Sequence, residues 1–539
     1  MSIRLQFALL LTVLWSGSGC SNSTSGGNQP QASQTAEAGE PGKQASGKRE
    51  FAQAPDGELN PPDTVQRPQH AETMTVALIK EKRVPAPRGD DDQLPDLSTR
   101  AQGIDWPTFL GPDRNSTSPE KGIITDWSEG ALKILWQIKL GTSYGIGSVS
   151  KGRYFQCDQV DDVTLVNCHH AETGKLLWQF DYMVEYDDLF GYDSGPRCSP
   201  VIEGNRVYIY GVEGTLLCLR ASDGALIWQI DVNKKFGVQQ NFFGVGSTPI
   251  IEGDLVLAMV GGSPEPVPPG QLDQAEGNGS GIVAFDKYTG EVKYKVTDEL
   301  ASYASPQVTT IGDRRWGFMF ARGGLIGFEP KTGKVDFHYP WRATSLESVN
   351  ASTPVVVGDE VFISETYGVG SSLLKVTPGA YEVVWKDKAR SRERAMATHW
   401  NTPVYRDGYL YGSSGRHTQN AELRCIEWKT GKISWSIPRL TRSSLLYVDG
   451  HFICLGEYGS MILFKANPRE FQPVGEYLLK DPKHKSRVKP DPLFNNNSIG
   501  LDSPLLLKYP CWAAPIISHG LLYVRGSDRV VCIELIPKS

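Results

Sequence analysis

The chain has 539 residues and a formal net charge of -6, and 40% of its residues are hydrophobic while 22% are charged. This balance allows one or more large cores, and the lack of a basic excess argues against nucleic acid as a general partner. Gly (56), Pro (35) and Trp (13) are frequent, and short apolar runs alternate with Gly, Pro, Asp and Asn. Such punctuation predicts many short strands joined by turns, so we expect an all-β protein.

The first 20 residues have the pattern of an export signal. Arg4 supplies a positive charge, residues 5–15 an apolar core, and SGSGC (residues 16–20) a cleavage point. Cys20 follows small residues as in a bacterial lipoprotein cleavage box, although Gly17 stands where such boxes usually have Leu. Two alternatives stay open: lipidation of Cys20, which would tether the chain to a membrane surface, and plain secretion. Both predict a location in the periplasm or on a membrane of a bacterial cell envelope.

Residues 21–103 are rich in Ser, Gly, Gln, Pro and charge, and they have neither helix nor strand periodicity. This composition predicts a disordered linker. At Ile104 the character changes to IDWPTFLGPDRNSTSP, and we expect one folded domain over residues 104–539.

A repeated motif governs this domain. In TGKLLW, which begins at Thr173, a turn Gly is followed four residues later by a large aromatic residue. The same spacing returns in DGALIW, TGEVKY, TGKVDF and TGKISW, with a looser copy in PGAYEVVW. Two apolar strands around a tight turn, as in SPVIEGNRVYIY, precede the motif. One unit therefore has four strands, and because a lone sheet of this kind leaves both faces apolar, the units must stack as propeller blades.

The copies predict an eight-bladed β-propeller of four-stranded antiparallel blades. They lie near residues 145–180, 197–230, 247–296, 304–338, 351–386, 401–437, 443–478 and 512–536. The last copy lacks a fourth strand, whereas ALKILWQI (residues 131–138) precedes the first blade, so pairing of the N- and C-terminal strands is expected to close the ring. The repeat aromatics are expected to dock on the next blade as structural staples: Trp136, Trp178, Trp228, Tyr294, Phe337, Trp385 and Trp435.

The combination of a small residue, polar residues, a TG turn and a docking Trp resembles the repeats of pyrroloquinoline-quinone (PQQ) propellers. That family includes quinoprotein alcohol dehydrogenases and the non-enzymatic lipoprotein BamB of the outer-membrane barrel-assembly machinery. The resemblance covers about residues 104–537, and the opening DWPTFLGPDRNSTSP is similar to the start of exported bacterial members. It implies the propeller fold and leaves the function open, because enzymes and scaffolds share these repeats.

The cysteines bear on this choice. Quinoprotein alcohol dehydrogenases typically carry two adjacent cysteines beside the quinone, with a carboxylate-rich calcium site and a catalytic Asp, and no two cysteines of this chain are adjacent. A small residue recurs six positions before the repeat Gly: Cys168, Cys218, Ala284, Gly327 and Cys425. We expect these positions to be buried and structural. Cys157 with Cys168 is the best candidate for a local disulfide, and two buried thiols are the alternative. The cysteine spacing fits no metal site, and we assign neither metal ligands nor catalytic residues.

A small ligand is expected at the mouth of the channel, where the beginnings of the innermost strands converge. The candidates for contacting such a ligand, including a cofactor, are Arg197, Gln240, Asn241, Tyr303, Asn350, His399, Arg442 and Trp512. A cationic pair with amides would suit an acidic or carbonyl-bearing ligand such as a quinone, and an ordinary hydrated channel is the alternative. Three segments are candidate contact loops: residues 182–193, 261–281 and 480–504, the last with a basic cluster.

From these observations we expect a monomeric, non-catalytic scaffold of the cell envelope that binds envelope proteins through its loops. The alternatives are a PQQ- and calcium-dependent dehydrogenase of alcohols or sugars, and a propeller that binds a carbohydrate or peptide without turnover.

Overall fold

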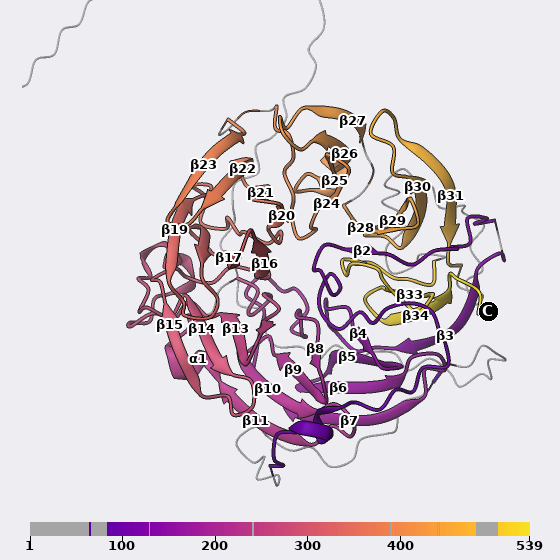
Figure 1. Ribbon diagram of the computed structural model, residues 1–539, viewed down its shortest axis with the longest axis horizontal. Coiled ribbons are helices and arrows are strands. Elements are labelled where there is room, and N and C mark those ends of the chain that lie inside the picture. The colour runs from indigo at the N-terminus through magenta and orange to yellow at the C-terminus, as the bar shows by residue number, and fades with distance from the viewer. Residues whose placement is uncertain are drawn as a thin grey trace, which may run out of the picture. The chain divides into compact units, whose positions relative to one another are not determined.

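The computed structural model describes residues 64–65, 83–128, 130–239, 242–388, 391, 393–438, 440, 442–480 and 505–538. Cys20 and the expected export signal lie outside these residues. Eight sheets follow one another around a ring in chain order (Figure 1), each with four antiparallel blade strands. The predicted eight-bladed β-propeller is confirmed. No helix within the described ranges is long and apolar enough to cross a membrane.

In each blade the first strand is innermost and the fourth is outermost. The first blade holds β4 (Ser148–Ser150), β5 (Arg153–Val160), β6 (Val163–His170) and β7 (Leu176–Met183). The second holds β8 (Val201–Glu203), β9 (Arg206–Tyr210), β10 (Thr215–Arg220) and β11 (Leu226–Asp231). The third holds β12 (Ile250–Glu252), β13 (Leu255–Met259), β14 (Ile282–Asp286) and β15 (Val292–Val296). The fourth holds β16 (Gln307–Ile311), β17 (Arg314–Phe320), β18 (Gly324–Phe328) and β19 (Val335–Pro340).

The remaining blades repeat this order. The fifth holds β20 (Val355–Val357), β21 (Glu360–Glu365), β22 (Gly370–Thr377) and β23 (Ala380–Lys386). The sixth holds β24 (Val404–Arg406), β25 (Tyr409–Ser414), β26 (Glu422–Glu427) and β27 (Ile433–Pro438). The seventh holds β28 (Ser443–Val448), β29 (His451–Gly456), β30 (Ser460–Lys465) and β31 (Gln472–Leu478). Short elements outside the blades are β1 (Thr64–Val65), β2 (Thr117–Ser118), η2 (Gly89–Asp92), α1 (Val232–Phe236), η3 (Pro269–Gln274) and η4 (Thr418–Asn420).

The eighth blade is built from both ends of the chain. The C-terminal strands β32 (Ile516–Ser518), β33 (Leu521–Arg525) and β34 (Arg529–Glu534) form its inner part, and β3 (Lys133–Lys139) adds the outer strand by antiparallel pairing with β34. The three labels β3, β33 and β34 lie together in Figure 1. The predicted closure is confirmed, and it leaves neither end of the ring as a free sheet edge.

The repeat aromatic of one blade docks on the glycine turn of the next. The Trp178 indole donates from Nε1 to the carbonyl oxygen of Ala221 at 3.0 Å. A Cβ on Gly224, which has φ +78°, would lie 2.6 Å from the ring of Trp178. The repeat Gly therefore has two roles, because it allows the left-handed turn and leaves room for the neighbour's indole.

The other predicted staples follow the same rule. Each of these aromatics donates to a carbonyl in the next blade: Trp136 to Ala171, Trp228 to Lys287, Tyr294 to Pro330, Trp385 to Trp428 and Trp435 to Asn467. Phe337 has no donor and instead packs on Tyr381 of the fifth blade, with ring centroids 5.2 Å apart.

The small residue of each repeat lies directly opposite the docking aromatic. Cys168 pairs with Trp178, and Gly327 pairs with Phe337. A Cβ on Gly327 would lie 2.3 Å from the Phe337 ring, which explains the small residue at that position. The fifth blade departs from this pattern, because Leu373 lies opposite Trp385. Cys157 lies opposite Val166, two positions away from Cys168, so these two cysteines do not face each other. All eight described cysteines are buried and free, and the candidate disulfide is not formed.

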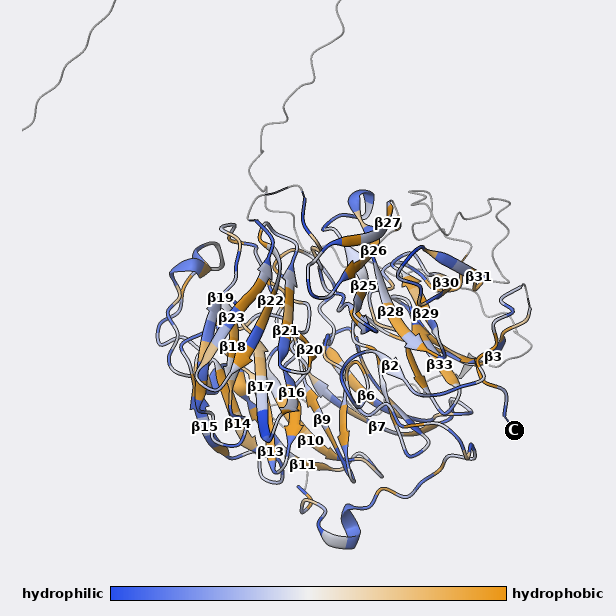
Figure 2. Ribbon diagram, turned by 45° about the horizontal axis from the view of Figure 1, so that its top comes forward, coloured by the Kyte–Doolittle hydropathy of each residue, from blue (hydrophilic) through white to orange (hydrophobic). Residues whose placement is uncertain are grey.

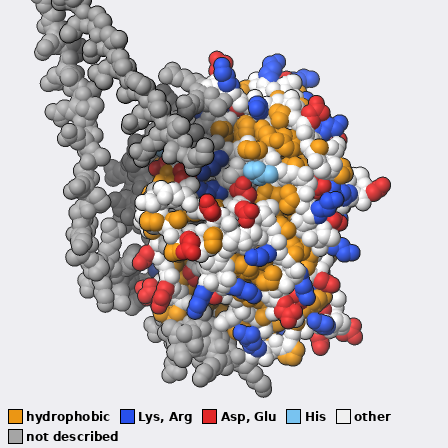
Figure 3. Space-filling model, turned by 90° about the vertical axis from the view of Figure 1, so that its left-hand side faces the viewer, with side chains coloured by type: hydrophobic (Ala, Val, Ile, Leu, Met, Phe, Trp, Pro, Cys, Tyr) orange, Lys and Arg blue, Asp and Glu red, His pale blue; other side chains and the backbone are white. Residues whose placement is uncertain are grey.

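Apolar residues concentrate within the blades, and the connecting loops are mostly hydrophilic (Figure 2). On the flank formed by the outer strands of the third to fifth blades, apolar side chains lie among charges of both signs (Figure 3). Val335, Tyr381 and Val384 are exposed there. The insertion at residues 261–281 is packed against the blades, because Leu272 is buried and Asp273 accepts from Arg322 at 2.8 Å.

Part of the expected linker is bound to the propeller. Asp92 forms an ion pair with the buried Arg206 at 2.6 Å, and the Leu94 side chain packs into the core between the first and second blades. The Arg153 guanidinium donates to the carbonyl of Pro95. The expectation of a disordered linker up to residue 103 is therefore wrong for residues 83–103. The boundary was predicted from local composition, which does not reveal contacts with blades that lie much later in the sequence.

Residues 104–118 cross the ring and close one end of its channel. Trp106 forms a β-bridge with Val149 of the first blade, Arg114 accepts from Gln307 of the fourth, and β2 pairs with β28 of the seventh. Leu110 has φ +62° and Arg114 φ +54°, a conformation that residues other than glycine rarely adopt. The contacts with several blades hold this backbone in place, so the channel is blind.

Candidate functional site at the channel mouth

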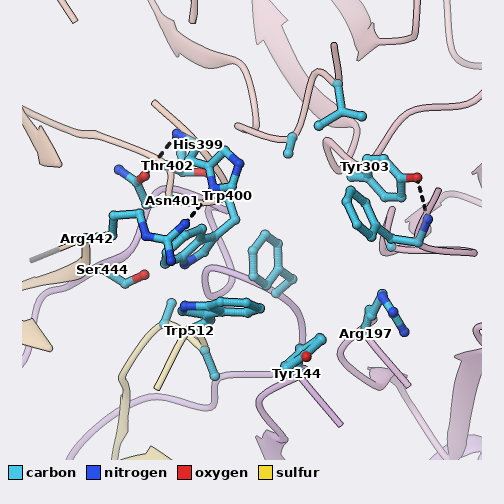
Figure 4. A pocket seen from close by; sticks show the side chains of 18 of the residues that line it. Tyr144, Arg197, Tyr303, His399, Trp400, Asn401, Thr402, Arg442, Ser444 and Trp512 are labelled. Atoms are coloured by element: carbon cyan, nitrogen blue, oxygen red, sulfur yellow. Dashed lines mark hydrogen bonds between the residues drawn. The ribbon is translucent and has the colours of Figure 1, made fainter. Parts of the chain in front are cut away.

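A cavity of about 470 Å³ occupies the open end of the channel (Figure 4). Phe109 and Leu110 of the crossing segment belong to its wall and separate it from the far end. Every blade contributes at least one residue at or near the start of its innermost strand: Tyr144, Arg197, Thr248, Tyr303, Val349, Thr402, Ser444 and Ala514. The volume is that of a small-molecule or side-chain pocket.

Five of the eight predicted contact residues line this cavity: Arg197, Tyr303, His399, Arg442 and Trp512. Asn350 lies behind the wall, where it is 1% exposed and donates from Nδ2 to the carbonyls of Ala321 and Trp341. Gln240 and Asn241 lie outside the described residues. The position of the cavity could be predicted from the sequence because the beginnings of the inner strands converge there. A role of these residues in cofactor binding stays a prediction.

Glu457 organises one side of the cavity. Its carboxylate is fully buried and accepts from Arg442 Nη2 at 2.7 Å, from Trp512 Nε1 at 3.2 Å and from Thr418 Oγ1 at 3.0 Å. The Arg442 guanidinium lies 4.4 Å from the centroid of the Trp400 ring. The positive charge of Arg442 is thus matched within the protein, and both tryptophans are held in fixed orientations.

Asp188 pairs with an arginine in the same way on the opposite side of the cavity. Its side chain is buried and accepts from Arg197 Nη2 at 2.7 Å. The other carboxylate oxygen accepts the backbone N–H groups of Phe190 at 2.9 Å and Tyr192 at 3.1 Å. The predicted cationic pair of Arg197 and Arg442 is present, but each cation is neutralised by its own carboxylate.

His399 is a neutral member of the site. Burial, together with the charges of Arg442 and Arg416, lowers the pKa of His399 to about 3. Its Nδ1 lies 3.5 Å from Arg442 Nη1, which can only donate, so Nδ1 accepts and the proton resides on Nε2. Nε2 lies 3.2 Å from the Tyr367 hydroxyl oxygen, which can accept a hydrogen bond from the Nε2–H group.

Aromatic rings form an almost continuous wall around the cavity. Trp512 lies 5.0 Å from Trp400 and 4.9 Å from Tyr144 between ring centroids, with interplanar angles of 42° and 46°. Tyr192 lies 6.0 Å from Trp512 and 5.5 Å from Phe243. These tilted contacts are typical of aromatic clusters and leave a polarisable surface toward the cavity.

Sequence reasoning missed several of these residues. Tyr144, Phe243, Tyr367 and Arg416 line the cavity. Only their loop positions could have indicated this, because Tyr144 and Phe243 precede the innermost strands β4 and β12, whereas Tyr367 and Arg416 follow the second strands β21 and β25. Phe190 and Tyr192 lie in the segment 182–193, which was expected to be a contact loop beside the channel, and both line the cavity.

A family model described as "Outer membrane protein assembly factor BamB" matches residues 162–437, just over half of the chain. The chain belongs to the PQQ-like β-propeller family. This confirms the resemblance inferred from the repeats. The family assignment fixes the architecture around the cavity, and the ligand has to be inferred from the residues that line it.

Individual relatives of this PQQ-like propeller include enzymes. The dehydrogenase subunit of the quinone alcohol dehydrogenase from Gluconacetobacter polyoxogenes is 28% identical over 179 residues, covering 31% of this chain and 21% of the relative. The same values hold for the subunit from Komagataeibacter europaeus. The chain thus spans about a fifth of the length of the curated relatives it matches.

Two solved structures are similar to this chain. The quinohemoprotein alcohol dehydrogenase of Comamonas testosteroni matches with a TM-score of 0.54 and 12% identity, covering 81% of each chain. BamB of Moraxella catarrhalis matches with a TM-score of 0.45 and 13% identity, covering 75% of this chain and 98% of BamB. At these identities the likeness concerns the fold alone.

The cavity residues do not fit PQQ bound with calcium. No group of three or more His, Cys, Asp or Glu residues within the described part of the chain is arranged to hold a metal ion. Glu457 and Asp188, the buried carboxylates beside the cavity, are occupied by arginines, and Glu347 is an exposed wall residue. A calcium ion needs six or more oxygen ligands, and this donor set does not supply them.

Proposed function

We propose that the chain is a non-catalytic binding or assembly scaffold of a bacterial cell envelope. The observation that carries this proposal is the engagement of both buried mouth carboxylates, Glu457 and Asp188, by Arg442 and Arg197. A carboxylate held in this way neither coordinates a cation nor acts as a base without first losing its arginine. The description of the matching family, an outer membrane protein assembly factor, supports an envelope location.

The proposal includes export, action as a monomer, and an envelope protein as the partner. It also includes attachment to a membrane when Cys20 carries lipid. Mass spectrometry of the mature N-terminus tests this last part: an acylated Cys20 supports the anchor, and an unmodified N-terminus at or after Cys20 rules the anchor out while leaving export in place.

Calorimetry with PQQ and Ca²⁺, followed by dye-linked oxidation of ethanol and glucose, tests the absence of catalysis. We expect neither heat of binding nor dye reduction. A quinoprotein alcohol dehydrogenase reconstituted in the same buffer is the positive control. Stoichiometric quinone binding with dye reduction would overturn the scaffold proposal.

The second candidate function is a quinone-dependent dehydrogenase. It is favoured by the 179-residue match to quinone alcohol dehydrogenase subunits. It would require Glu457 to exchange Arg442 for a calcium ion, because the described cavity offers no free buried carboxylate. The same calorimetry decides between the two functions.

A further inference from the structure

The loop between β7 and β8 presents apolar side chains to solvent at the rim of the cavity. Leu189 is 42% exposed, Phe190 53% and Tyr192 47%. The Asp188 carboxylate fixes the backbone N–H groups of Phe190 and Tyr192, so the exposed rings are held by the fold rather than left on a loose tip. Rigidly presented apolar side chains beside a cavity mark a binding surface for an apolar group.

The cavity also contains hydrogen-bond donors without an acceptor. Arg416 is exposed, lies 4.4 Å from the centroid of the Tyr367 ring and has no carboxylate within ion-pair distance among the described residues. Trp400 Nε1 is buried without a partner in the same described set. Each of these donors could bond an oxygen of a ligand, and an Arg binds a carboxylate especially well.

Several other polar side chains of the wall are engaged already, although the buried hydroxyl of Ser199 has no partner among the described residues. Asn401 accepts from the His399 backbone N–H and donates to the Ser413 carbonyl. The hydroxyl of Thr402 accepts from Thr353, and that of Thr248 accepts from Ser199. A sugar needs many hydrogen bonds from its site, so this wall favours a ligand whose buried part is apolar.

We infer that the channel mouth binds an aromatic side chain of a polypeptide partner, with an acidic side chain of the same segment on Arg416. The tilted wall rings suit edge-to-face packing with an inserted ring, and the blind floor at Phe109 and Leu110 limits entry to one side. Exposed Glu347 also lines the cavity and would repel a second acidic side chain. The inference rests on the scaffold function and names the chemistry of its partner.

The test uses the full mature chain and three capped hexapeptides in fluorescence anisotropy, each labelled at its end. The first has the sequence Ser-Gly-Phe-Glu-Gly-Ser, the second replaces Phe by Ala, and the third replaces Glu by Gln. We expect saturable binding of the first, binding at least tenfold weaker for the second, and about fivefold weaker for the third. Equal binding of the first and second peptides would overturn the aromatic site.

Two arginine variants separate the site from nonspecific attraction. Arg416→Gln should remove the difference in binding affinity between the Glu and Gln peptides. Arg406→Gln, which removes a cation 4.7 Å from the Tyr447 ring outside the cavity, should preserve it. An Arg416→Gln variant that still prefers the Glu peptide would contradict the inference.

Cellohexaose, an oligosaccharide, tests whether the cavity binds a sugar instead of a peptide. Competition between this oligosaccharide and the Phe peptide, with a lower dissociation constant for the sugar, would overturn the peptide ligand in favour of a glycan. Absence of peptide binding together with absence of PQQ binding overturns only this inference, whereas PQQ binding overturns the scaffold function as well.

Discussion

Replacing the repeat glycine of the second blade by alanine tests the inter-blade staple. In Gly224→Ala the new Cβ lies 2.6 Å from the Trp178 ring, whereas carbon atoms normally approach to roughly 3.5–4.0 Å. The indole must retreat by about 1 Å, which costs about 1–3 kcal/mol as overpacking and weakens its hydrogen bond to Ala221. The left-handed backbone adds about 1–2 kcal/mol for a residue with a Cβ. The sum is a loss of about 2–5 kcal/mol.

Gly253→Ala is the matched control. Gly253 has φ +59°, and a Cβ there meets nothing within 4 Å, so this variant has the backbone cost without the clash. The free energy of unfolding, from urea titration, should therefore be about 1–3 kcal/mol lower in Gly224→Ala than in Gly253→Ala. Hydrogen exchange of the Trp178 indole N–H should accelerate only in Gly224→Ala. Equal losses in both variants would refute the claim that the ring seats on the glycine.

Three further predictions concern the site, the closure and the cysteines. Glu457→Gln leaves Arg442 without its counter-charge and should cost about 3–5 kcal/mol in urea unfolding, and a variant within 1 kcal/mol of wild type would contradict the buried ion pair. In the turn between β32 and β33 of the eighth blade, His519 Nε2 lies 3.1 Å from Asp105 Oδ1, and this hydrogen bond raises the pKa of His519. The contribution of His519 to the free energy of unfolding is therefore complete below the unfolded-state pKa of 6.5 and is lost as the pH rises through the folded-state pKa. The destabilisation by His519→Gln should thus be larger at pH 6 than at pH 9, and a pH-independent loss would contradict this sign. Burial raises the thiol pKa of all eight described cysteines. Ellman's reagent should therefore modify none of them in the native protein and all of them after unfolding: Cys157, Cys168, Cys198, Cys218, Cys425, Cys454, Cys511 and Cys532. Rapid labelling of any of these in the native state would contradict their burial.

The fold was predictable because its determinants are local in the sequence. The turn Gly, the aromatic four residues later and the small residue six positions earlier all belong to one hairpin, as Cys168, Gly174 and Trp178 illustrate. Their roles follow from steric requirements that recur in the five regular copies of the motif. Two residues at a fixed spacing are enough to indicate the motif. Because the motif is repeated along the chain, the propeller architecture could be predicted from the sequence.

The site was predictable in position and only partly in chemistry. The beginnings of the inner strands must meet at the channel mouth, which located Arg442 and Trp512. The charge state of the cavity depends on Glu457, which lies 15 positions after Arg442, across the open end of the β28–β29 hairpin, and has no motif of its own. The closed channel floor depends on left-handed Leu110 and Arg114, and neither residue type signals that conformation.

The eighth blade has a consequence for biosynthesis. Strand β3 lies near the start of the domain and its partner β34 near the last residue, so the pairing joins segments separated by almost the whole length of the domain. A chain emerging from the ribosome can assemble the first seven sheets before the strands of the eighth are all available. Closure of the ring therefore follows assembly of the other blades, and a chain cut short before Arg529 exposes an unsatisfied strand to proteases and chaperones.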